Sequence, residues 1–102
     1  SMSTEPGSFS EFSQRLSIAI ADIDKLAATD PDPMVGSIQR QLRFVRQWTQ
    51  GGRRPDQQDL DKLTFGQMAS RSVHETDARL ANELYELAHY LTFWPKTEPI
   101  RP

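Results

Sequence analysis

Apolar residues recur at steps of three and four along most of this 102-residue chain. Such spacing places them on one face of an α-helix, because successive helical residues turn by about 100°. No segment alternates with a period of two, and no Asn-Gly or Asp-Gly pair marks a hairpin. The spacing therefore predicts an all-α protein, and the length of the chain suits one domain.

Residues with well-known capping preferences divide the first half of the chain into two helices. Ser8 and Glu11 form a capping box at the start of the first helix, which the Asp-Pro-Asp-Pro run at 30–33 ends. Asp32 within that run caps the second helix, and the glycine pair at 51–52 ends it. The apolar stripes expected to be buried are Phe9, Phe12, Leu16, Ile20, Ile23 and Ala27, followed by Val35, Ile38, Leu42, Val45 and Thr49.

The second half of the chain predicts one helical turn and two more helices. Asp56 caps the turn, and Thr64 with Gln67 forms a second capping box. Thr76 is the expected cap of the last helix, where Asp77 adds a favourable charge at the positive end of the helix dipole. The last helix has the clearest stripe, a leucine seam that consists of Leu80, Leu84, Leu87 and Leu91.

Together these elements predict a bundle of about four helices plus a short extra helical turn. We expect the bundle to span residues 8–94, with a disordered leader at 1–7 and a tail at 95–102. No apolar run approaches the roughly 18 residues of a membrane span. The chain has no cysteine, which fits a reducing compartment, and we expect a cytoplasmic protein.

The net charge of −2 argues against binding driven by charge to nucleic acid or membranes. The distribution is uneven, because five arginines and no acid lie between Arg40 and Arg54. With Phe44 and Trp48 they make the best nucleic-acid feature of the chain, and such binding would fall steeply with salt. We favour the interpretation that the arginines form a solvated flank while the two aromatic residues widen the buried face.

No arrangement of residues indicates catalysis, a cofactor or a metal. The two histidines, His74 and His89, are fifteen residues apart and form no ligand pair. Glu83 and Glu86 resemble half of a carboxylate metal site, but they face away from the leucine seam. No Gly-x-Ser-x-Gly elbow or phosphate-binding glycine loop is present. We therefore expect a protein that is not an enzyme.

Aromatic residues outside the predicted core indicate a binding surface. They are Trp48, Tyr85, Tyr90, Phe93 and Trp94. A bundle of this size cannot easily bury them all, and exposed aromatic residues commonly anchor protein interfaces. We expect at least two of them in a protein–protein contact, and the alternative is that some fill the ends of the bundle.

Two stretches of the chain carry a family resemblance. They are residues 40–46, Arg-Gln-Leu-Arg-Phe-Val-Arg, and residues 63–69, Leu-Thr-Phe-Gly-Gln-Met-Ala, continued by Glu-Thr-Asp at 75–77 and by Leu80, Leu84 and Tyr85. In this order the stretches resemble a family of small helical immunity proteins of the bacterial type VI secretion system. Those proteins neutralise effector toxins that hydrolyse NAD(P) in the cytoplasm of a rival cell. The resemblance covers roughly residues 38–91.

The resemblance implies a cognate toxin domain as partner, bound in a tight one-to-one complex that blocks its substrate cleft. Acidic side chains could then occupy places meant for the phosphates of a dinucleotide. The residues that we expect to contact the toxin are Trp48, Asp56, Asp59, Glu75, Asp77 and Tyr85. Which toxin is bound, and whether NAD or NADP is protected, stays open. The alternative function is a helical adaptor or self-associating bundle without a toxin partner.

Overall fold

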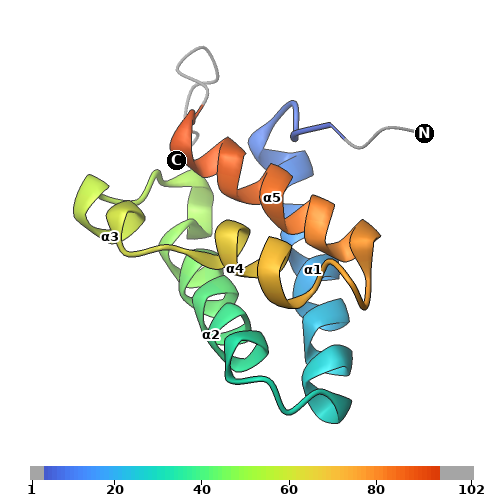
Figure 1. The fold of residues 1–102 in the computed structure, drawn as a ribbon. Helices are drawn as coiled ribbons and strands as arrows, with labels where there is room; N and C mark the ends of the chain where they lie inside the picture. Colours follow the sequence, from blue (N-terminus) through green and yellow to red (C-terminus); the bar gives the residue numbers. More distant parts are fainter. Residues whose placement is uncertain (1–3, 95–102) are drawn as a thin grey trace.

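Helices make up the secondary structure of residues 4–94, the part of the chain that the computed structural model describes (Figure 1). The elements are α1 (Phe9–Thr29), α2 (Pro33–Trp48), the 3-10 turn η1 (Gln50–Gly52), α3 (Gln57–Asp61), α4 (Phe65–Ser72) and α5 (Ala78–Thr92). The described residues contain no strand. The predicted all-α bundle is thereby confirmed, with α3 as the short extra turn. No helix in this part of the chain is both long and apolar enough to cross a membrane.

The four longer helices enclose one core. α1 packs against α2 and α5, and α4 packs against the same two helices from the other side. α3 contributes no buried residue and lies at the edge of the bundle (Figure 1). The leucine seam is fully buried, and so is every residue of the predicted α2 stripe. Burial of these side chains removes apolar surface from water, which is the main force that stabilises the fold.

Two of the predicted helix starts form as expected. The hydroxyl of Ser8 accepts a hydrogen bond from the backbone N–H of Glu11 at 3.1 Å, while the Glu11 carboxylate accepts one from the Gly7 N–H at 3.1 Å. Asp32 accepts a hydrogen bond from the Met34 N–H at 2.9 Å, and Pro33 takes the first helical position. Both caps satisfy backbone donors that have no partner within the helix.

The predicted capping box of α4 is wrong. Thr64 is the N-cap residue, but its side chain makes no capping hydrogen bond, because its backbone angles of −133° and 7° differ from the extended geometry typical of a cap. The side chain of Gln41 on α2 binds it instead. Its carbonyl oxygen accepts from the Thr64 N–H at 2.8 Å, and its amide nitrogen donates to the Thr64 hydroxyl at 3.1 Å. We call this pair of hydrogen bonds the Gln41 clasp.

The start of α5 lies one residue later than predicted. Asp77, not Thr76, is the N-cap, and its carboxylate accepts from the Leu80 N–H at 3.0 Å. The reason is that the turn after α4 continues, since the N–H groups of Thr76 and Asp77 both donate to the carbonyl of Val73. Asp77 therefore combines a hydrogen bond with a favourable charge at the helix N-terminus.

An aromatic layer closes one end of the bundle, which is the alternative expected for some of the aromatic residues outside the predicted core. Tyr90 is buried and stacks on Phe12, with ring centroids 4.7 Å apart. Trp94 is buried between Tyr90 and Phe9, at centroid distances of 5.4 and 5.8 Å. Both residues lie beside the start of α1, whose phenylalanines cover them. They fill the bundle end and offer no exposed anchor.

Ion pairs connect α1 to its neighbours. Arg15 binds Glu83 of α5 through two hydrogen bonds, at 2.8 Å from Nε and 2.6 Å from Nη2. Arg43 of α2 donates two hydrogen bonds of 2.9 Å to the two carboxylate oxygens of Asp24. These bonds and one from Gln39 lower the pKa of Asp24 to about 2.

Candidate partner-binding surface

The described residues offer no arrangement for metal chemistry. Residues 4–94 contain no group of three His, Asp or Glu side chains that could hold a metal ion. Glu83, one half of the carboxylate pair noted in the sequence, is bound to Arg15.

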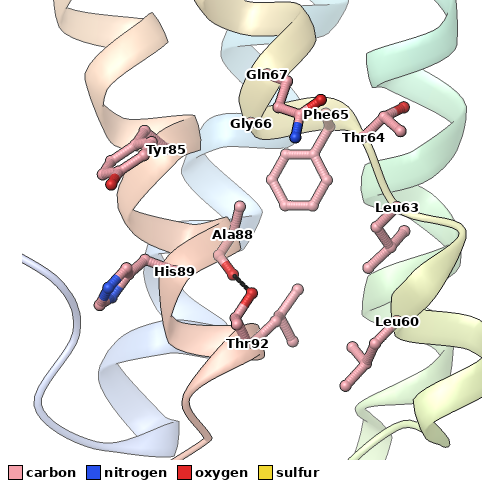
Figure 2. A pocket seen from close by; sticks show the side chains of 11 residues that line it. Leu60, Leu63, Thr64, Phe65, Gly66, Gln67, Tyr85, Ala88, His89 and Thr92 are labelled. Atoms are coloured by element: carbon pink, nitrogen blue, oxygen red, sulfur yellow. Dashed lines mark hydrogen bonds between the residues drawn. The ribbon is translucent and has the colours of Figure 1, made fainter.

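A groove opens between α5 and the segment that joins α3 to α4 (Figure 2). Its volume is about 200 Å³. Leu60, Leu63 and the ring of Phe65 face the open space, with Ala88 and Thr92 of α5 across from them (Figure 2). The groove thus has an apolar lining that a side chain of a partner could fill.

Two contacts determine the shape of this groove. Gly66 lets α4 and α5 approach closely, because a Cβ atom at this position would lie 2.9 Å from the Cβ of Ala88. The Gln41 clasp holds the backbone at Thr64, at the other side of the groove. Both contacts join residues from different helices, so the groove is a product of packing.

Tyr85 stands between this groove and a second hollow of about 200 Å³ at the turn between α4 and α5. The side chain of Tyr85 is 55% exposed. His89 and Phe93 continue the exposed row along α5, with centroids 6.1 Å from Tyr85 to His89 and 4.6 Å from His89 to Phe93. Figure 2 shows Tyr85 and His89 on the side of α5 that is turned away from Leu60 and Leu63.

A third hollow, of about 270 Å³, lies where α2 meets α3. It brings together three of the residues expected to contact a partner, Trp48, Asp56 and Asp59, and also includes Arg53 and Arg54. Asp56 is exposed, and Asp59 lies 4.0 Å from the ammonium of Lys62. Asp59 of this hollow and Leu60 of the groove are consecutive residues of α3.

The six expected contact residues therefore fall into two groups with the groove between them. Trp48, Asp56 and Asp59 form the first group. Tyr85 belongs to the second group, together with the turn that carries Glu75 and Asp77. Glu75 is exposed in that turn, whereas Asp77 has a structural role as the cap of α5.

Several features of this surface were missed in the sequence. Phe44 was expected to widen the buried face but is 51% exposed, because it lies one helical turn after the exposed Arg40, on the outward side of α2. Its spacing of four residues from Arg40 is the signal that could have placed it there. The residues before α1 were also missed. The carboxylate of Glu5 lies 2.9 Å from Nδ1 of His89 on α5, and Pro6 is buried.

Comparison with known proteins identifies one family. The model of the family Tsi6 matches residues 11–92, about four-fifths of the chain. No curated protein and no solved structure matches the chain. The matched region begins in the first turn of α1, at Glu11, and ends with Thr92, the last residue of α5. It therefore covers all five α-helices of the described residues, from which the core and the groove are built.

Proposed function

From the premise that this chain belongs to Tsi6, a family of type VI immunity proteins, we propose that it binds a cognate toxin that hydrolyses NAD(P) and covers its substrate cleft. The single observation that carries this proposal is the extent of the family match across the whole bundle. The toxin-specific part rests on the resemblance of residues 40–46 and 63–69 to immunity proteins against such toxins. We place the protein's action in the cytoplasm, where NAD(P) has to be protected.

Inhibition by occlusion needs a complementary surface and no catalytic groups. The exposed Tyr85 beside an apolar groove supplies an aromatic anchor, and the half-buried Trp48 supplies another. Aromatic residues in such positions often dominate the binding energy of an interface. A standard interface would bury about 800 Å² on each partner, and the groove and the second hollow, which share Gly66 and Tyr85, offer a surface over which it could extend.

The acidic residues at both ends of this surface suit a site built for a dinucleotide. Cleft residues that bind phosphates are cations and hydrogen-bond donors, and carboxylates can take the place of the phosphates. We propose Asp56 and Asp59 at one end and Glu75 at the other as such contacts. Asp77 contributes its charge next to Glu75 while it caps α5.

The decisive experiment co-expresses the chain with the toxin encoded beside it and measures cellular NAD and NADP. Protection of either pool supports the proposal, and unchanged loss of both pools in the presence of the folded protein refutes it. The pool that is protected identifies the toxin's substrate.

Charge variants test the proposed contacts separately from the function. Glu75→Lys should weaken binding, and Asp77→Asn should do the same without loss of the cap, because asparagine caps helices as well as aspartate does. Lys25→Glu, on the exposed surface of α1, is the matched control. Unchanged affinity in both test variants would show that the toxin does not contact this turn.

A second candidate function is self-association without a toxin. The observation that favours it is the row formed by Tyr85 and His89 on α5 and by Phe93 at its C-cap, in which Tyr85 and Phe93 are exposed. This row could pair with the same row of another copy. Light scattering of the purified chain distinguishes the two. A monomer that protects NAD(P) excludes self-association as the main function, and a stable dimer that leaves the toxin active supports it.

A further inference from the structure

The outward face of α2 carries two aromatic side chains, Phe44 and Trp48, that stack on each other in the free protein. The rings of Phe44 and Trp48 lie 5.7 Å apart with their planes at 17°, and we call this pair the aromatic stack. Trp48 packs partly against the core, and Phe44 lies over it with 51% of its surface exposed. Because Trp48 is held by the core, the stack is preorganised and would lose little side-chain entropy on binding.

Two arginines without an acidic partner bracket the aromatic stack. Arg40 precedes Phe44 by one helical turn, and Arg53 follows Trp48 and shares its hollow. No carboxylate among residues 4–94 forms an ion pair with either side chain. Arg43 is different, because both of its terminal nitrogens donate to Asp24. Arg40 and Arg53 therefore leave positive charge before and after the aromatic stack in the sequence, and Arg46 is a further exposed arginine of α2 without an ion pair among the described residues.

We propose that the aromatic stack, between Arg40 and Arg53, receives an acidic segment of the toxin in which carboxylates flank an apolar side chain. This inference rests on the proposed function and names the chemistry of one part of its partner. Guanidinium groups bind carboxylates through paired, charge-assisted hydrogen bonds, and arginine and aromatic residues are enriched at interface hot spots.

Positive and negative charges are distributed unevenly around the aromatic stack. Arg40 lies one helical turn before Phe44, whereas Asp56 and Asp59 line the hollow that contains Trp48 and Arg53. A toxin that places cations over α3 and carboxylates over α2 can dock in one orientation, because the reversed orientation brings like charges together.

Nucleic acid fits these observations less well. Its bases stack on open ring faces, but Phe44 and Trp48 cover one face of each other. An acidic protein segment offers carboxylates to Arg40 and Arg53 and an apolar side chain to the exposed ring of Phe44.

The test measures association and dissociation rates of the full chain on the immobilised toxin domain encoded beside it. Phe44→Ala should raise the dissociation constant by about tenfold or more, mainly through faster dissociation. Arg40→Glu and Arg53→Glu should slow association by about fivefold or more at low salt, and the difference should shrink at high salt. Matched controls on α1 are Ile18→Ala, which shortens a side chain that is 56% exposed, and Lys25→Glu, and both should bind like the wild type.

Each other outcome overturns a defined part of the proposal. Wild-type affinity in Phe44→Ala removes the aromatic stack from the interface, and unchanged rates in both charge variants exclude an acidic segment. A dimer of the free chain that Phe44→Ala dissociates would assign the aromatic stack to a second copy. Binding of a labelled single-stranded oligonucleotide that Phe44→Ala abolishes would assign it to nucleic acid. If the wild type does not bind the toxin at all, the proposed function itself is wrong.

Discussion

Replacement of Gly66 by alanine should destabilise the protein even though alanine is the better helix former. The new Cβ would lie 2.9 Å from the Cβ of Ala88, and ordinary contacts between such atoms begin at 3.4 Å. Both atoms are fixed to helix backbones, so neither can rotate away, and α4 and α5 have to separate by about 0.5 Å or more. Overpacking of this kind costs about 1–3 kcal/mol, against a gain of at most about 1 kcal/mol from helix propensity.

The expected net loss of unfolding free energy, measured by urea denaturation, is therefore about 1 kcal/mol, and at most about 2 kcal/mol when the full propensity gain applies. For a domain of this length, each kcal/mol lowers the Tm by about 4–8 °C. Because Gly66 and Ala88 both line the groove, the variant should also weaken toxin binding.

A double-mutant cycle separates the clash from other effects of the substitution. Ala88→Gly alone should cost about 1 kcal/mol through helix propensity. In the double variant the methyl group has moved from one helix to the other. The stability that this variant loses should therefore be smaller by about 1 kcal/mol than the sum of the losses in the two single variants. A Gly66→Ala protein as stable as the wild type, or a cycle without coupling, would refute the close packing of α4 on α5.

Three further predictions concern hydrogen bonds between helices. Glu83→Ala should lower the unfolding free energy, measured in urea, by about 1–2 kcal/mol. The side chains of Arg15 and Glu83 are each only 18% exposed, so the value should lie between those of surface and of buried salt bridges. A loss below about 0.3 kcal/mol would contradict this. The pKa of Asp24 is lowered to about 2 by Arg43, so the stabilisation that this ion pair gives is complete above pH 4 and is lost as the pH falls toward 2. The difference in Tm between the wild type and Asp24→Asn should therefore shrink over that range. A constant difference would speak against the ion pair. Gln41→Ala should cost about 1 kcal/mol and speed amide exchange at the start of α4, measured by NMR, and unchanged exchange would show that the clasp does not hold the loop.

Local patterns in the sequence were sufficient to predict most of the fold. The leucine seam and the α2 stripe are buried as expected, because a helix places every third or fourth residue on one face whatever its neighbours are. The caps of Ser8 and Asp32 form because their partners lie two or three residues away. Such contacts depend on short stretches of chain.

The candidate surface could be predicted only in part. The exposure of Tyr85 follows from its position off the leucine seam, and Asp56 begins α3 as expected, although its side chain makes no capping hydrogen bond. The burial of Tyr90 and Trp94 did not follow, since both lie off the same seam and are covered by phenylalanines from the start of α1. Position on one helix does not reveal which other helix lies beside it.

The sequence by itself determined the helices, most of their ends and the residues of the core, because periodicity and capping act within a few residues. The tertiary structure decided how the helix ends are held, which aromatic residues stay exposed and where the groove opens. The Gln41 clasp joins residues 23 positions apart, and the groove exists because Gly66 admits a close contact with Ala88. These features depend on which segments packing brings together, and no local pattern contains that information.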